Sequence, residues 1–266
     1  MANNPLVSII IPTYNRWKYI TRAINSCLNQ TYENIEVLVI DDCSDDNTEE
    51  VVKSIQDDRL KYFKNQKNSW PCISRNNGIK FSKGQYINFL DDDDELLPDK
   101  IKLQLEKFES SDIENLGVVT WDVEYRRSDI NEIKKNRKQG YIYKDLLKAY
   151  CISGTQQMLI RKEVFDKVSF DEKLEANQEY DLMIQISKYY NYDYLDKLVA
   201  IQNESENQIS FNFRKKLNWT MYLYQKYKQE FKDNWVYGYN FLRYHYLFMK
   251  YFVGKVFWKK VYNLLP

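Results

Sequence analysis

Acidic side chains gather at two points where an apolar run of the sequence ends. Residues 86–90 lead directly into four consecutive aspartates, Asp91 to Asp94, and residues 35–40 lead into the pair Asp41 and Asp42. Carboxylates this close together repel one another, and they are costly to bury unless a cation compensates them. The natural candidates are Mg²⁺ and Mn²⁺, because these hard ions prefer oxygen ligands and often hold substrate phosphates as well.

The spacing within the longer cluster suits this chemistry. Asp91 and Asp93 are two residues apart, so in a loop one carboxylate can face a metal ion while the other faces a sugar hydroxyl. The alternative is a solvated acidic turn that caps the helix expected after Pro98, since runs of like charge are usually solvated surface. A calcium loop fits poorly, because residues 41–50 lack the central glycine and the glutamate spacing of an EF-hand.

Other residue types argue against a metal site built from histidine and cysteine. The four cysteines lie far apart without a C-x-x-C pair, and His245 is the single histidine. We expect reduced cysteines and a cytoplasmic setting. The net charge of +1 over 266 residues points to no nucleic-acid partner. We also expect neither a signal peptide nor a membrane-spanning helix, because no uncharged apolar run reaches about 18 residues.

Alternating strands and helices must position the acidic clusters. Apolar runs predict strands at 6–12, 35–41, 60–65 and 85–90. The segments between them predict helices at 15–30, 47–56 and 74–84, the second with Asn47 or Thr48 as its N-cap. Short connections between these elements indicate βαβ units and a mainly parallel sheet. Ligands bind beyond the carboxyl ends of such strands, so the same rim should also carry Pro12, Thr13 and Tyr14.

The second half of the chain continues this pattern with less regular spacing. We expect a helix at 99–111, a strand at 117–125, a charged loop at 126–140, and a strand with a short helix within 154–174. Residues 177–190 predict a helix that turns Leu182, Ile186 and either Tyr189 or Tyr190 inward. From about Phe211 the composition changes to long aromatic and basic helical stretches.

Four segments occur in order along the chain: IIIPTYNR, VLVIDDCSDDNT, SRNNG and YINFLDDDDELLPDK. Together they resemble the pattern of glycosyltransferase family 2, of the type that builds bacterial capsule, lipopolysaccharide and other glycans. The match is close over residues 6–100 and looser to about residue 187. The P-loop and the dinucleotide-binding G-x-G-x-x-G are both absent.

The resemblance implies a fold and a domain plan. The fold would be GT-A, an α/β fold in which a Rossmann-like, mainly parallel sheet is flanked by helices, with a helical aromatic and basic C-terminal extension. The GT-A domain would span 1–210, with a nucleotide-sugar half at 1–100 and an acceptor half at 101–210. The extension would span 211–266.

The resemblance also implies how the nucleotide base is held. Pro12, Thr13 and Tyr14 would lie beside the base. Asp42 would accept a hydrogen bond from a uracil ring, and Asp41 would support that pocket. Simpler structural roles remain open, namely strand termination for the first three residues and an N-terminal cap of the next helix for Asp42.

The D-x-D motif would hold the rest of the donor. Arg75-Asn76 would border the nucleotide, Asp91 would lie near the ribose, and Asp92 would fill the variable middle position on the nucleotide side. Asp93 is the expected ligand of Mn²⁺ or Mg²⁺, together with Asp91. Asp94 would cap or orient the segment that follows.

Transfer to a hydroxyl needs a general base, because the hydroxyl is a poor nucleophile until its proton is taken. In the family an acidic residue at the start of a helix does this, which here implies Glu179, with Asp181 as the second candidate. The alternative for both is a favourable acidic residue at a helix N-terminus. Gly154 and Thr155 would line the acceptor side.

Two departures from the family pattern affect the expected activity. Ser69-Trp70-Pro71 stands where many relatives have glycine before the Arg-Asn pair, so the loop near the donor differs. The Gln-x-x-Arg-Trp motif of processive polymerases is missing, so we expect one sugar to be added per acceptor.

The C-terminal segment 234–266 contains no aspartate or glutamate. Its five positive charges are interleaved with many aromatic residues, a combination that suits the lipid headgroup region. The basic residues are Arg243, Lys250, Lys255, Lys259 and Lys260, and the aromatic residues include Trp235, Phe241, Tyr244, Phe248, Phe252, Phe257 and Trp258. The basic positions do not share one helical face, so packing on the catalytic domain or on a second subunit is the alternative. Peripheral contact with the inner face of the cytoplasmic membrane therefore stays open.

These features predict an inverting, non-processive, metal-dependent glycosyltransferase. It would move a sugar from a nucleotide donor, expected to be a UDP-sugar, to a glycan or lipid-linked acceptor. A non-catalytic module that binds nucleotide sugars is the alternative. A sugar-1-phosphate nucleotidyltransferase is disfavoured, because it needs a glycine-rich loop after the first strand and residues 12–19 contain no glycine.

Overall fold

The protein is described here from a computed structural model. It describes residues 4–126, 131–135, 138–149, 158–175, 177–203, 213–234, 236–243 and 246. The expected acceptor residues Gly154 and Thr155 and most of the tail beyond residue 243 lie outside these ranges.

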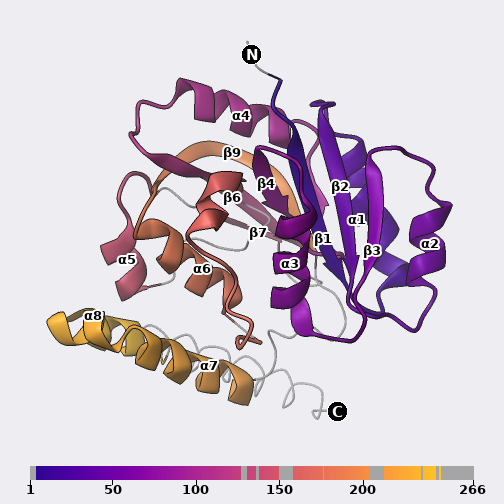
Figure 1. Ribbon diagram of the computed structural model, residues 1–266. Coiled ribbons are helices and arrows are strands. Elements are labelled where there is room, and N and C mark those ends of the chain that lie inside the picture. Colours follow the sequence, from indigo (N-terminus) through magenta and orange to yellow (C-terminus); the bar gives the residue numbers. More distant parts are fainter. Residues whose placement is uncertain are drawn as a thin grey trace, which may run out of the picture.

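The N-terminal half is a parallel sheet with helical crossovers (Figure 1). Its strands are β1 (Val7–Thr13), β2 (Ile35–Asp41), β3 (Leu60–Lys64) and β4 (Tyr86–Phe89), in the order β3-β2-β1-β4. The connecting helices are α1 (Trp17–Leu28), α2 (Thr48–Ser54) and α3 (Trp70–Phe81). Every residue of β1 and β2 is buried, which is why both appear in the sequence as continuous apolar runs. The expected βαβ units are confirmed.

The second half extends the sheet in mixed directions. Beyond β4 come β8 (Leu159–Arg161), β6 (Leu116–Arg126), β9 (Asn191–Asn203) and β5 (Glu95–Leu96). β6 and β9 are parallel, whereas β8 runs antiparallel to β4 and β6, and β5 runs antiparallel to β9. The helices are α4 (Lys100–Ser110), α5 (Tyr143–Lys148), a 3₁₀ helix η2 (Lys162–Asp166) and α6 (Gln178–Ser187).

Two expectations about local structure need correction. Part of the expected loop 126–140 is β7 (Asn131–Lys134), which pairs with β6 alone, and an edge position explains why a charged segment can form a strand. Asn47 stands at the N-cap of α2 but makes no side-chain bond there. Instead, the carboxylate of Asp46 accepts the Thr48 backbone N–H at 2.9 Å.

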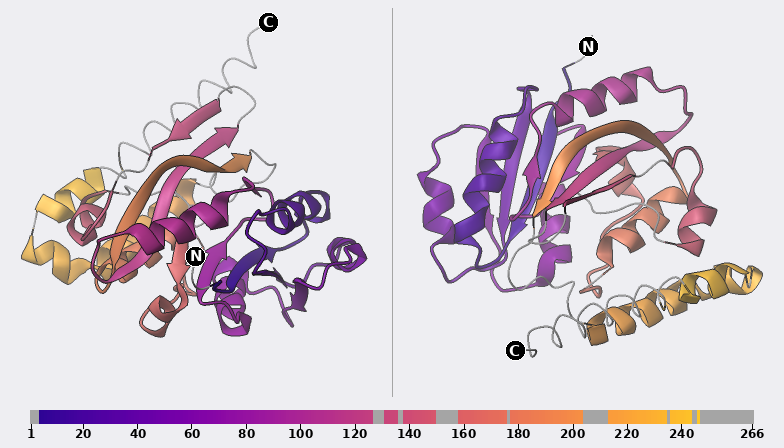
Figure 2. Two further views of the ribbon diagram at one scale, coloured as in Figure 1. Left: turned by 90° about the horizontal axis from the view of Figure 1, so that it is seen from above. Right: turned by 180° about the vertical axis from the view of Figure 1, so that it is seen from behind.

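Alternating strand residues divide the core into two layers, one on each face of the sheet (Figures 1 and 2). On β1, Val7, Ile9 and Ile11 face the layer formed with α1 and α4, and Ile10 faces the layer formed with α3 and α6. Gly78 lets α3 approach β1, because a Cβ atom there would lie 2.4 Å from Cγ2 of Ile10.

The C-terminal extension packs on the catalytic domain as far as the structure describes it. Helices α7 (Phe213–Lys226) and α8 (Lys228–Asp233) run along the side of the molecule that carries α5 and α6 (Figures 1 and 2). Phe231 and Phe241 are buried, and the Phe241 ring stacks on Tyr180 of α6. Within the described ranges, every helix is too short or too polar to cross a bilayer.

Candidate active site

The carboxyl ends of β1, β2 and β4 bring the predicted donor residues to one rim. The backbone N–H of Asp42 donates to the Thr13 carbonyl at 2.8 Å, which joins the first two strand ends. The Thr13 hydroxyl donates to the Asp92 carboxylate at 2.7 Å, which joins the first strand end to the D-x-D loop. Tyr14, the next residue, is 43% exposed and so remains available at the edge of the rim.

Asp41 shapes the turn after β2. It is fully buried, and its Oδ1 accepts the backbone N–H of Ser44 at 2.9 Å and the Ser44 hydroxyl at 2.6 Å. The Tyr62 hydroxyl donates to its other oxygen. All of these bonds lie within the protein, so the geometry agrees with a supporting role for Asp41.

Asp42 caps a helix, although not the helix that follows it in the sequence. Its carboxylate accepts the backbone N–H groups of Ser69 at 3.0 Å and Trp70 at 2.8 Å, at the start of α3. Asn65 donates to the same carboxylate at 2.8 Å. These contacts place Asp42 between β2 and α3 at the rim. Each carboxylate oxygen can accept more than one bond, so capping does not prevent a further donor from binding.

Trp70 adopts an unusual backbone conformation at this capped end. Its φ of 73° lies in the left-handed region, which residues with a side chain rarely adopt, and 43% of the residue is exposed. Glycine would adopt this φ without steric cost, so the conformation of Trp70 is one that its own side chain disfavours.

Arg75 connects the donor side of the rim to α6. The residue is 4% exposed, and its Nη2 lies 2.8 Å from the Asp91 carboxylate and 3.8 Å from the Glu179 carboxylate. Its Nη1 donates to the Gln178 side chain at 2.5 Å, and its guanidinium lies over the Phe170 ring. Burial acts to lower the pKa of Arg75, but Asp91 and Glu179 outweigh it and raise the pKa, so the guanidinium stays charged.

Asp92 and Asp93 are held by α1 and the residue before it. Arg16 Nη1 lies 3.0 Å from the Asp93 carboxylate and 4.0 Å from that of Asp92. Arg22 donates to the Asp93 carbonyl at 2.5 Å. Burial raises the pKa of Asp92 to about 7, and the opposing effect of Arg16 is smaller. Sequence reasoning missed both arginines; Arg16 could have been noticed within the segment IIIPTYNR.

Asp94 joins the D-x-D loop to the end of β9. Its Oδ1 accepts the backbone N–H of Asn203, at the end of β9, at 3.0 Å. Among the described residues its Oδ2 is buried without a hydrogen-bond partner, and burial together with the neighbouring Asp91 and Asp93 raises its pKa. The side-chain hydrogen bond of Asp94 is thus made to the distant strand β9, and a role for Asp94 in orienting the segment that follows it stays a prediction.

The two base candidates lie in different environments. Glu179 lies beside Arg75, and its side chain is 25% exposed. Asp181 is fully buried and accepts bonds from Lys226 at 2.9 Å, Tyr227 at 2.7 Å and Gln185 at 2.7 Å. Two residues along a helix turn a side chain by about 200°, to the opposite face. The expectation that Asp181 could act as the base therefore needs correction, because its carboxylate faces the C-terminal extension.

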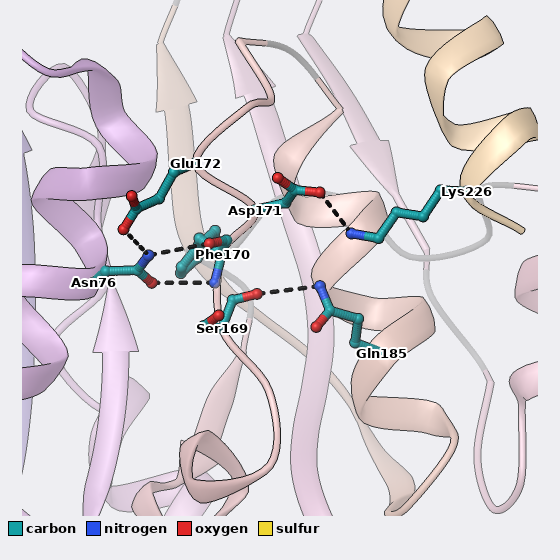
Figure 3. A pocket seen from close by; sticks show the side chains of 7 residues that line it. All are labelled: Asn76, Ser169, Phe170, Asp171, Glu172, Gln185 and Lys226. Atoms are coloured by element: carbon teal, nitrogen blue, oxygen red, sulfur yellow. Dashed lines mark hydrogen bonds and ion pairs between the residues drawn. The ribbon is translucent and has the colours of Figure 1, made fainter.

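Asn76 also differs from expectation. Its side chain bonds the backbone N–H and carbonyl of Phe170 at 3.1 and 3.0 Å, on one wall of a pocket of about 300 Å³ between α3, α6 and α7 (Figure 3). It therefore ties α3 to the segment before α6. Nothing in the local sequence distinguishes this role from a place beside the nucleotide.

Comparisons with known proteins identify the family and the fold. The sequence model of the family described as Glycosyl transferase family 2 matches residues 8–169. A GalNAc(5)-diNAcBac-PP-undecaprenol beta-1,3-glucosyltransferase of Campylobacter jejuni subsp. jejuni serotype O:2 is 33% identical over 177 residues, which are 65% of this chain and 57% of that protein.

Two solved structures have a similar fold. S. aureus TarS, residues 1–349 in complex with UDP-GlcNAc, matches with a TM-score of 0.62 at 22% identity, over 76% of this chain and 59% of that one. A mannosyltransferase of Pyrobaculum calidifontis in complex with GDP-Man and Mn²⁺ matches with a TM-score of 0.62 at 17% identity, over 86% of this chain and 65% of that one. The chain thus spans less than two thirds of each of these three proteins. The structural likeness confirms the expected GT-A fold.

Proposed function

Since this chain belongs to glycosyltransferase family 2, we propose that it transfers one sugar from a nucleotide-sugar donor to a glycan or lipid-linked acceptor, with inversion at the sugar carbon. The observation that carries the proposal is the position of Arg75. One buried guanidinium contacts both Asp91 of the D-x-D motif and Glu179 at the start of α6. The donor and the base would therefore share one cleft, as direct displacement by an activated hydroxyl requires.

The donor is proposed to be a UDP-sugar. Asp42 would receive a hydrogen bond from the uracil ring, with Pro12, Thr13 and Tyr14 beside the base and Asp41 shaping the turn below it. Asp91 would lie near the ribose, with Asp92 on the same side and Arg75 at the border of the nucleotide. The complex of TarS with UDP-GlcNAc supports this choice. The mannosyltransferase complex with GDP-Man makes GDP-sugars the alternative class of donor.

The D-x-D loop supplies carboxylate oxygens, the kind of ligand that hard divalent ions such as Mn²⁺ and Mg²⁺ prefer. No cluster of three or more acidic, histidine or cysteine side chains suited to a metal is found within the described ranges. Asp93, with Asp91, would therefore share the ion with the donor phosphates, an arrangement usual for such ions. A bound ion supplies charge stabilisation for the leaving diphosphate. The mannosyltransferase complex with Mn²⁺ supports this choice of ion.

Glu179 is proposed as the general base. Its partly exposed carboxylate would take the proton of the acceptor hydroxyl as the bond to the sugar forms. Arg75 lies 3.8 Å from that carboxylate and would fix its direction. One base and direct displacement give inversion, and the missing Gln-x-x-Arg-Trp motif supports a single addition. Gly154 and Thr155 would line the acceptor side.

The acceptor is proposed to be presented at a membrane surface. The Campylobacter relative is named for an undecaprenol-linked glycan, which supports a lipid-linked acceptor. Exposed apolar or aromatic residues recur at helical spacing in the extension: Val236, Tyr239, Leu242 and Tyr246. Flotation with vesicles tests this proposal. Binding to anionic but not to zwitterionic vesicles is expected, and binding to neither would refute membrane contact.

A screen of nucleotide sugars with Mn²⁺ or with a chelator tests the main proposal. We expect transfer or slow donor hydrolysis with one UDP-sugar, lost in Asp93→Ala and Glu179→Gln variants that fold normally. Loss of the base should lower kcat by about 10²–10⁴-fold. UDP binding without any turnover of donor would instead indicate a non-catalytic binding module. Full activity of Asp93→Ala in the chelator would refute the metal assignment.

A further inference from the structure

The first turn of α6 is held from two opposite sides. On the side of α3, Arg75 contacts Gln178 at 2.5 Å and Glu179 at 3.8 Å. On the other side, Asp181 receives hydrogen bonds from Lys226 and Tyr227 of the C-terminal extension. The turn that carries the proposed base therefore lies between α3 and the extension.

The contacts of Asp181 are those that a buried carboxylate requires. The residue has no exposed surface, and an uncompensated charge there would be costly. Gln185 supplies one donor from within α6, while the ammonium of Lys226 and the hydroxyl of Tyr227 come from beyond residue 213. Full compensation of Asp181 thus depends on the extension being docked.

A second acidic residue, outside α6, contacts the same part of the extension. Lys226 also lies 2.8 Å from Asp171, and the Tyr222 hydroxyl donates to Asp171 at 3.0 Å. Figure 3 shows Lys226 reaching from its helix toward Asp171 at the pocket beside α6. Asp171 precedes α6 by seven residues, so the same lysine bonds both the approach to the helix and its first turn.

The junction before α6 gives a reason why such support matters. Asn177, at the N-cap, has a φ of 60° and makes no side-chain capping bond. Asparagine is one of the few residues with a side chain that adopt this left-handed conformation readily, so the turn before α6 is little strained. The direction in which α6 begins is therefore fixed by contacts of its first turn more than by its own cap.

We propose that Lys226 and Tyr227 are positioning residues for catalysis, which hold the first turn of α6 so that Glu179 faces the cleft. This inference rests on the proposed function of Glu179. It gives the C-terminal extension a role in the turnover of the sugar donor that is separate from any contact with a membrane.

Two tyrosines of the extension provide a matched test. Tyr227→Phe removes the hydroxyl that bonds Asp181, and Tyr222→Phe removes the hydroxyl that bonds Asp171. We expect Tyr227→Phe to lower kcat by roughly 10- to 100-fold, because small misplacements of a reacting group cost this much. The KM for the donor and the affinity for UDP should change less than about twofold, since neither tyrosine contacts the proposed donor residues. Tyr222→Phe should keep kcat within about twofold.

Lys226 variants keep the proposal testable if Tyr227→Phe does not fold. Lys226→Met should lower kcat, and Lys226→Arg should restore most of it by keeping a charged donor near Asp181. Equal losses of kcat in Tyr222→Phe and Tyr227→Phe would overturn the proposal, as would an unchanged kcat in Lys226→Met.

Hydrogen exchange of the α6 amides separates this inference from the proposed function. Faster exchange in residues 181–184 is expected in Tyr227→Phe but not in Tyr222→Phe. If the wild-type protein transfers no sugar while this difference in exchange is seen, the proposed function fails, but Lys226 and Tyr227 still hold the first turn of α6. If transfer occurs and the α6 amides of both variants exchange alike, the positioning role of Lys226 and Tyr227 is refuted.

Discussion

The left-handed backbone at Trp70, on the donor rim, can be tested by comparing the stabilities of two variants at this position. We consider Trp70→Gly and Trp70→Ala, which both remove the indole and leave the backbone N–H that bonds Asp42. With φ at 73°, alanine must adopt a left-handed conformation that costs roughly 1–2 kcal/mol. Glycine avoids this cost but loses about 0.5–1 kcal/mol more chain entropy on folding. We therefore expect the glycine variant to be more stable than the alanine variant by about 1 kcal/mol.

A matched pair at Thr21 gives the opposite expectation. Thr21 is exposed in the middle of α1, where the backbone is helical. There alanine should be more stable than glycine by about 1 kcal/mol. Urea unfolding followed by far-UV circular dichroism, with equal m-values, measures all four free energies of unfolding. An alanine variant at position 70 that is as stable as the glycine variant would show that the left-handed conformation is not the constraint at this site.

Three further predictions follow from contacts of the same rim. Gly78→Ala should lower the free energy of unfolding by about 1–3 kcal/mol, because the added Cβ would lie 2.4 Å from Cγ2 of Ile10. The double variant with Ile10→Val should be no more stable, since valine keeps that Cγ2 atom. Chemical denaturation of both variants measures these free energies. Arg75→Met should destabilise by about 1–3 kcal/mol, because it removes a buried guanidinium that bonds Gln178 and pairs with the partly exposed carboxylates of Asp91 and Glu179. An unchanged free energy of unfolding in thermal and urea unfolding would contradict the ion-pair assignment. The pKa of Asp92 is raised from 3.8 to about 7, so its contribution to stability is complete below pH 4 and is lost as the pH rises through 7. That loss is on the order of 4 kcal/mol at about 1.4 kcal/mol per pKa unit. In a metal-free buffer, Asp92→Asn should remove this decrease of the free energy of unfolding between pH 4 and pH 8.

β1 and β2 could be predicted because each is buried on both faces, and β3 and β4, which are less completely buried, still appear as short runs rich in apolar residues. The run Ile35–Asp41 matches β2 residue for residue, and the other three lie within one residue of expectation at each end. A fully buried parallel strand must be apolar throughout, so its own composition defines it. The helix at 177–190 is also confirmed as α6, with Tyr190 and not Tyr189 turned inward.

Strands that depend on pairing with another strand were not predicted. β5 has two residues and exists through its pairing with β9, while β7 is a charged segment that pairs with β6. β9 was not expected either, although it is the longest strand. Its exposed central residues interrupt the apolar pattern by which a strand is found in a sequence.

The family, the GT-A fold and the acidic residues at the strand ends could all be identified from the residue types alone. Their types and order along the chain carry this information, since parallel strands deliver their carboxyl ends to one edge. The partner of each of these residues became known from the fold. Asp42 bonds the start of α3, Arg75 joins Asp91 to Glu179, and Asp181 of α6 bonds the C-terminal extension. These contacts join residues up to about a hundred positions apart, and a side chain's partner there depends on which helix packs against which, a property that no local pattern records.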